Sequence, residues 1–160
     1  LEDLKNQKYD FTFCSRMDQE PLIDFIPVAR QELVVIVPPD HPLSDRTEIR
    51  LPETLDYPQI LFSRRSGLRP MIDKLFLACG KQPDCIFEID EDQTIAGFVA
   101  NGFGIAVVPN MPILASMHLK VIHITEANWE RRFYIAYLKN RYRTPLAEQF
   151  LSYVKSHALI

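Results

Sequence analysis

The sequence predicts an α/β fold, and three observations support this class. Short apolar segments typical of strands alternate with segments of helical periodicity along almost the whole chain. The 160 residues are 47% hydrophobic and 24% charged, a composition that can bury a sizeable core. The run from Leu33 to Val37 is continuously apolar and mostly β-branched, which is typical of a strand covered on both faces. We therefore expect a largely parallel sheet with helices packed against it.

The first half of the chain contains one clear helix among the predicted strands. Between Ser66 and Gly80 the apolar side chains recur at i, i+4, i+7, i+8 and i+11, which predicts a helix with one buried stripe. We expect Ser66 or Gly67 to be its N-cap and Gly80 its left-handed C-cap. The predicted strands are 10–14, 32–37, 59–62, 85–89, 103–108, 119–124 and 132–138.

Two further helices are expected in the second half. The first should begin at Asp90 or Asp92 and end at 101–102, where Asn-Gly favours a left-handed cap. The other opens with Thr144 and Pro145, a typical helix start. Its apolar side chains have the same helical spacing, and we expect them to form its buried face: Leu146, Phe150, Tyr153, Val154 and His157.

Charge argues against a nucleic-acid-binding chain, and hydropathy excludes a membrane-spanning one. Eighteen basic and twenty-one acidic side chains give a net charge of -3, so this chain offers no strong non-specific attraction to phosphate backbones. No apolar run approaches the roughly 18 residues that a membrane-spanning helix needs. The chain does not begin with methionine, and its first four residues resemble the middle of a helix, so we interpret it as a fragment of a longer protein.

Three cysteines, Cys14, Cys79 and Cys85, lie among apolar neighbours in the sequence. Their odd number and the absence of a CxxC or Cys/His pattern argue against a disulfide framework and against a zinc site. We expect buried free thiols and hence a reducing, cytoplasmic location.

Sequence motifs for catalysis are absent, and we predict neither an enzyme nor a cofactor. The chain has no GxSxG, HExxH or GxxxxGK[ST] motif, and its four histidines are scattered. Four acidic residues, Glu88, Asp90, Glu91 and Asp92, lie close enough in sequence to suggest a metal site. We favour the alternative that they cap a helix and interact with the positive end of its dipole, so no metal is predicted.

The segment 62–69 is the best candidate for a ligand site. It joins the C-terminal end of a predicted strand to a helix N-terminus, where open α/β sheets bind ligands and where free N–H groups attract anions. Arginine can also bind a carboxylate or phosphate through two hydrogen bonds. We therefore predict ligand contacts from Ser63, Arg64, Arg65 and Ser66. The alternative is that the arginines are only solvated and that Ser66 is only a cap.

Taken together, these segments resemble the effector-binding domain of LysR-type transcriptional regulators. The similarity covers almost the whole chain, in the order that the family shows. The matching segments are 4–13, 32–43 with its His-Pro-Leu, Gly67-Leu68-Arg69 to Gly80, 99–109 with Asn-Gly-Phe-Gly, and 132–136.

The resemblance implies a two-lobed fold of the type-2 periplasmic-binding-protein kind, with a small effector between the lobes. Lobe II would be 38–122, lobe I would be 1–37 with 123–160, and the crossings would lie near 34–37 and 121–124. Lobe I would be incomplete, because the family has a further βαβ stretch and a winged helix-turn-helix before the first residue here. DNA binding would then belong to that absent domain, the full-length protein would be a homo-oligomer, and no membrane would be involved.

In such a fold, connections at the C-terminal ends of strands wall the cleft. This geometry adds Gln93 and Thr94 to the predicted ligand contacts, and the resemblance adds Phe103. We expect Asp92 to act only as a cap and the effector to be a small anion, most simply a carboxylate. Two alternatives stay open: a fragment of an extracytoplasmic solute-binding protein, and an enzyme with Cys79 or Cys85 as nucleophile.

Overall fold

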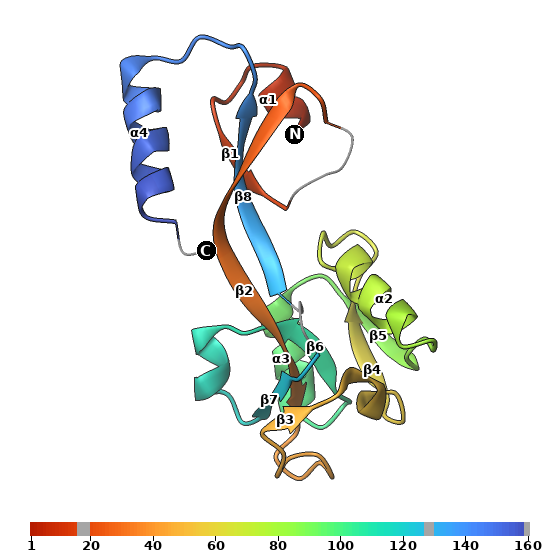
Figure 1. Cartoon of the computed structure of the whole chain (residues 1–160). Coiled ribbons are helices and arrows are strands. Elements are labelled where there is room, and N and C mark those ends of the chain that lie inside the picture. Colours follow the sequence, from red (N-terminus) through yellow and green to blue (C-terminus); the bar gives the residue numbers. More distant parts are fainter. Residues whose placement is uncertain (16–19, 127–129, 159–160) are drawn as a thin grey trace. The chain divides into compact units, whose positions relative to one another are not determined.

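The computed structural model describes residues 1–15, 20–126 and 130–158 (Figure 1). The chain divides into two compact units. Unit 1 contains Leu1–Gln31 and Glu130–Ile160, and unit 2 contains Glu32–Trp129. Unit 1 is therefore built from both ends of the chain. The expected lobe limits, at 37/38 and 122/123, fall inside unit 2 on this division, and the assignment of the lobes stays a prediction.

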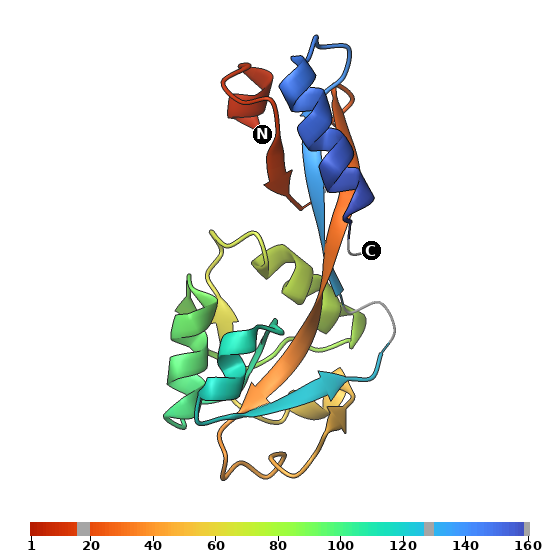
Figure 2. The same cartoon turned by 90° about the vertical axis from the view of Figure 1, so that its left-hand side faces the viewer.

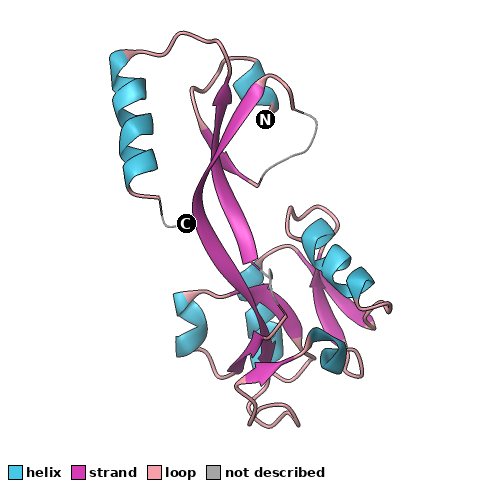
Figure 3. Ribbon diagram, viewed as in Figure 1, coloured by secondary structure: helices cyan, strands magenta, loops and turns pink. Residues whose placement is uncertain are grey.

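One long strand, β2 (Ile23–Val37), contributes to both units (Figure 3). Its last five residues are buried, as predicted for a strand covered on both faces. In unit 2 it pairs antiparallel with both β6 (Ala106–Pro109) and β7 (Lys120–Ile124), and β3 (Glu48–Ile49) pairs parallel with β7. The expectation of a largely parallel sheet is wrong here, because both neighbours of β2 run back along it.

A second sheet in unit 2 has the predicted parallel arrangement. Its strands are β4 (Gln59–Phe62) and β5 (Cys85–Ile89). The helix α2 (Arg69–Ala78) connects them, and α3 (Asp92–Ala100) follows β5. The buried side chains of α2, Ile72 and Phe76, confirm the stripe predicted from the spacing of its apolar residues.

The helices α2 and α3 cover opposite faces of this sheet. Glu88 of β5 hydrogen-bonds to Arg69 of α2, whereas the preceding Phe87 packs against Phe98 of α3 with ring centroids 5.4 Å apart. Successive side chains of a strand point to opposite faces, so each helix occupies its own face. Figures 1 and 2 show β4 and β5 with the two helices on either side.

The two sheets of unit 2 share a single apolar core. It includes the buried parts of β2, β4, α2, α3 and β6. Two short 3-10 helices, η1 (Leu51–Thr54) and η2 (Pro112–Ser116), each add a buried leucine, Leu51 and Leu114. This core fixes the ends of β4 and β5, and with them the loops that follow.

The start of α2 differs from the prediction and its end does not. The N-cap is Leu68, which makes no side-chain cap, rather than Ser66 or Gly67. Ser66 instead accepts the Leu68 N–H through its hydroxyl, at 3.3 Å, one turn earlier. Gly80 has a φ of +76° directly after the C-cap, so the predicted left-handed helix end is confirmed.

Unit 1 is a small sheet with two helices packed on it. Its sheet pairs β1 (Thr12–Cys14) antiparallel with β8 (Glu130–Leu138). It also contains α1 (Glu2–Lys5) and α4 (Pro145–Ser156). Thr144 caps α4 as expected, because its hydroxyl accepts the Ala147 N–H at 3.3 Å. None of the described helices is both long and apolar enough to cross a membrane.

The predicted buried face of α4 is wrong. Leu146 is 76% exposed and Tyr153 is 61% exposed, whereas Ala147 and Leu151 are buried. Leu151 packs with Val28, Ile135 and Tyr137 of the sheet. The helix carries two adjacent apolar stripes, and periodicity does not indicate which of them meets the sheet.

Candidate functional site

The C-terminal edge of β4 and β5 gathers six of the predicted ligand residues. Both strands end at this edge, because they are parallel and Phe62 lies opposite Ile89. The Ser63 N–H donates to the Ile89 carbonyl at 2.9 Å, which holds the loop after β4 against the end of β5. The residues brought to this edge are Ser63, Arg64, Arg65 and Ser66 after β4, and Gln93 and Thr94 in the first turn of α3.

Asp90 binds two members of the loop. The Ser63 hydroxyl donates to Asp90 Oδ1, and Arg65 Nη2 donates to Asp90 Oδ2 at 2.9 Å. The Arg65 side chain is 85% exposed and that of Asp90 is 50% exposed. The loop is therefore not a set of free cations, since one of its guanidinium groups already has an anionic partner.

Arg69 has a structural role that the other two arginines lack. Its side chain is 9% exposed and donates to the Phe62 carbonyl at 2.6 Å, to Glu88 at 2.7 Å and to Asp73 at 2.7 Å. Burial lowers the pKa of Arg69, but the hydrogen bonds that it donates to Glu88 and Asp73 raise its pKa above the usual value, so the group stays charged. Arg64 is 84% exposed and only approaches Glu88, with 3.9 Å between its Nε and Oε1.

The start of α3 also differs from the prediction. Its N-cap is Glu91, which makes no side-chain cap, so neither Asp90 nor Asp92 caps the helix. Asp90 is occupied by Ser63 and Arg65, and Asp92 accepts the adjacent Gln93 N–H at 2.9 Å. The side chains of Gln93 and Thr94 are exposed at this end of the helix.

Phe103 lies at the other end of α3, away from the six residues at the strand edge. It follows the helix and precedes Ile105, which bridges to Gln59 at the start of β4. Its ring packs against Phe98 and Phe87, with centroids 5.3 and 6.1 Å away. The nine residues of α3 span about 13 Å and separate the two ends.

Asp90 is the site residue that the sequence interpretation did not assign to the ligand loop. A signal for it existed: Asp90 directly follows β5, just as Ser63 directly follows β4, so parallel pairing places them side by side. The partners of Arg69 had no such signal, because they depend on how α2 packs against β5.

The three cysteines lack the features of an activated nucleophile. Cys14 and Cys79 are half-buried and Cys85 is exposed, so the expectation of three buried thiols is wrong. Desolvation raises the pKa of all three thiols, and nearby acidic charge raises it further for Cys79 and Cys85. A raised pKa favours the thiol form, which is a much weaker nucleophile than the thiolate. Within the described residues, no cluster of three His, Cys, Asp or Glu side chains could hold a metal ion.

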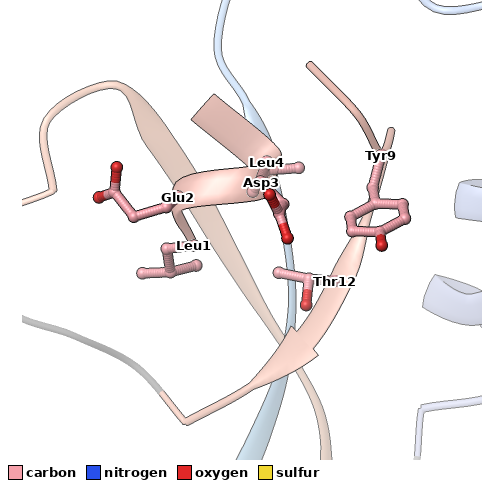
Figure 4. Close-up of a pocket in the computed structure, with 6 residues that line it drawn as sticks. All are labelled: Leu1, Glu2, Asp3, Leu4, Tyr9 and Thr12. Carbon is pink, nitrogen blue, oxygen red and sulfur yellow. The ribbon is translucent and has the colours of Figure 1, made fainter. Parts of the chain in front are cut away.

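A hollow of about 290 Å³ lies in unit 1 beside α1 and β1. Figure 4 shows Tyr9 and Thr12 on one side of it and Leu1 on the other, with the Glu2 carboxylate directed away from them. The Asp3 carboxylate already has a partner, because it lies 2.7 Å from Lys8 Nζ. We assign no ligand to this hollow.

Comparison with known proteins identifies the fold. A family model described as the LysR substrate binding domain matches residues 1–159. The chain belongs to the LysR substrate-binding domain family. Among curated relatives, the HTH-type transcriptional regulator YybE of Bacillus subtilis is 37% identical over 157 residues, which cover 98% of this chain and 54% of YybE. The activator CmpR of Synechocystis is 26% identical over 160 residues, which cover 98% of this chain and 53% of CmpR. This LysR-family chain thus spans about half the length of these relatives.

Solved structures of the LysR family have the same fold. The effector-binding domain of QuiR in complex with shikimate matches with a TM-score of 0.90 and 40% identity, over 98% of this chain and 75% of that chain. The regulatory domain of Synechocystis CcmR in complex with 2-PG matches with a TM-score of 0.84 and 24% identity, over 98% and 77%. The predicted type-2 periplasmic-binding-protein-like fold is confirmed. The alternative of a solute-binding protein is not supported, since the relatives are transcriptional regulators.

Proposed function

We propose that this chain is the ligand-sensing domain of a LysR-type transcriptional regulator that acts in the cytoplasm as a homo-oligomer. The domain has two lobes, lobe I (1–37 and 123–160) and lobe II (38–122), which can take two positions relative to each other. A small metabolite binds the domain and shifts the population between these two arrangements. An attached helix-turn-helix domain then changes its contact with DNA. The 40% identity to the effector-binding domain of QuiR, which has bound shikimate, carries this proposal. No catalytic step is part of it.

The effector site is proposed at the β4–β5 edge, with Ser63, Arg64, Arg65, Ser66, Gln93 and Thr94. We do not extend it to Phe103, which packs at the opposite end of α3. Gln93 and Thr94 are neutral hydrogen-bonding groups that orient a ligand without repelling its charge. The rest of the site comes from groups outside this edge.

A small carboxylate fits this edge because it can replace Asp90. An exposed ion pair such as Arg65–Asp90 contributes only about 0–1 kcal/mol, so little stability is lost when it breaks. A ligand carboxylate that binds Arg65 through two hydrogen bonds can therefore take the place of Asp90. Shikimate, the compound bound to QuiR, also bears a carboxylate.

Calorimetry on the full-length protein tests the proposal, with shikimate and a panel of other small carboxylates. We expect Arg65→Ala to weaken binding of the active compound at least about tenfold. The matched control is Arg46→Ala, whose guanidinium pairs with Glu53 at 2.6 Å and lies outside the loop. A mobility-shift assay with operator DNA should respond to the same compound. Unchanged affinity in both Arg64→Ala and Arg65→Ala would remove this site.

A further inference from the structure

A hollow of about 170 Å³ lies on unit 2 between α2 and β5, on the sheet face opposite α3. It is distinct from the proposed effector site, because Gln93 and Thr94 do not line it. Arg64 is the one residue that belongs to both. The apolar part of its wall consists of Leu61, Phe76 and Pro83, and Phe76 is fully buried.

The charged groups that α2 and β5 contribute to this hollow carry a net negative charge. The buried Arg69 lies between two carboxylates, Asp73 and Glu88, so the three groups together carry one excess negative charge. Each carboxylate uses only one oxygen for Arg69, Oδ1 of Asp73 and Oε1 of Glu88. Among the described residues no donor reaches Asp73 Oδ2 or Glu88 Oε2, so both oxygens can accept hydrogen bonds from a ligand.

The rim of the hollow is positive. Arg64 is 84% exposed, and its Nε is 3.9 Å from Glu88 Oε1, which is beyond hydrogen-bond distance. Its five N–H donors can therefore turn toward a ligand without breaking a strong contact. The hollow is thus lined by two carboxylates, an exposed arginine and a few apolar side chains.

We propose that this hollow binds a small zwitterion of the α-amino-acid class. The ammonium group donates to Glu88 and Asp73, and the carboxylate accepts from Arg64. A short aliphatic side chain packs against Pro83, the partly exposed member of the apolar wall. A simple anion would meet the two carboxylates, and a simple amine would leave Arg64 unused, so neither matches both ends. The volume of about 170 Å³ is sufficient for a small amino acid.

A titration of the full chain with L-alanine, followed by amide chemical shifts, tests this proposal. Propionate and ethylamine serve as probes that each keep one of the two charges of L-alanine. We expect shifts at Gln82, Cys85 and Glu88, and binding of propionate and ethylamine at least about tenfold weaker than that of L-alanine. Binding of either probe as tightly as L-alanine would overturn the proposal.

Two neighbouring arginines provide a matched pair of variants. Arg64 and Arg65 are 84% and 85% exposed, and only Arg64 lines the hollow. We expect Arg64→Ala to weaken L-alanine binding about tenfold and Arg65→Ala to change it less than about twofold. Equal effects of both variants, or shifts confined to Gln93 and Thr94, would assign L-alanine to the effector site and overturn the proposal.

Discussion

Asp90 holds Arg65 at the edge of the β4–β5 sheet, with 2.9 Å between Oδ2 and Nη2. Its other carboxylate oxygen accepts the Ser63 hydroxyl. The loop proposed to bind an anionic effector is thus occupied by an internal carboxylate. An effector that binds at the proposed site would have to displace Asp90 from Arg65, which has a direct consequence for affinity.

Replacement of Asp90 by asparagine should tighten the binding of a carboxylate effector. The substitution removes the competing charge but keeps the shape of the side chain, so Arg65 becomes available without loss of packing. Since the exposed pair is worth up to about 1 kcal/mol, we expect affinity to rise by up to about fivefold in calorimetry. Asp56→Asn is the control, because Asp56 only approaches Lys81, at 4.0 Å. Weaker binding in Asp90→Asn would mean that Asp90 contacts the ligand itself.

Arg69 should matter for stability far more than Arg64. Arg69→Met keeps much of the side-chain volume but removes three hydrogen bonds, and it leaves the Phe62 carbonyl without this donor. We expect a loss of about 2–3 kcal/mol in urea unfolding, whereas Arg64→Met should cost less than about 0.5 kcal/mol. Equal stabilities of the two variants would contradict the structural role of Arg69.

Two glycines offer a test of the packing around β4. A side-chain Cβ at Gly104 would lie 2.9 Å from the Pro58 carbonyl oxygen, whereas a Cβ at Gly97 in α3 would meet nothing within 4 Å. We expect Gly104→Ala to destabilise unit 2 by about 1–3 kcal/mol and Gly97→Ala to stabilise it by up to about 1 kcal/mol. Thermal unfolding of both variants measures the difference, and the same sign for both would contradict it.

His41 should make the fold less stable in mild acid. Desolvation lowers the pKa of His41 from 6.5, and its Nδ1 accepts the Leu43 N–H at 3.2 Å, which requires the unprotonated nitrogen. The unfolded chain therefore binds the proton at higher pH than the folded chain, so the free energy of unfolding falls as pH drops below about 6.5. We expect the stability advantage of the wild type over His41→Asn to shrink between pH 7.5 and pH 5. A constant difference would show that His41 does not contribute.

The elements of unit 2 could be predicted from the sequence because local signals specify them. The apolar spacing of α2 and the left-handed turn at Gly80 depend on nearby residues alone. The direction of β6 and β7 could not be predicted, since pairing with β2 is decided by contacts far apart in the chain. For the same reason the prediction of the buried face of α4 was wrong.

The candidate site was predictable only in part. Parallel pairing of β4 and β5 brings the loop after Ser63 together with Gln93, as the positions of strand ends indicated. Phe103 lies away from these residues because α3 runs from the strand edge to the turn that contains Phe103. The sequence indicates the turn but not the direction of the helix. The pairing of Arg65 with Asp90 depends on side-chain geometry, which no spacing in the sequence specifies.

Amide chemical shifts of the chain, recorded with and without a carboxylate that binds in calorimetry, test the central claim most directly. The account predicts that the largest changes fall on Ser63, Arg65, Gln93 and Thr94 at the β4–β5 edge. If these four stay unchanged while residues elsewhere respond, the effector binds at another place and the proposed site is wrong.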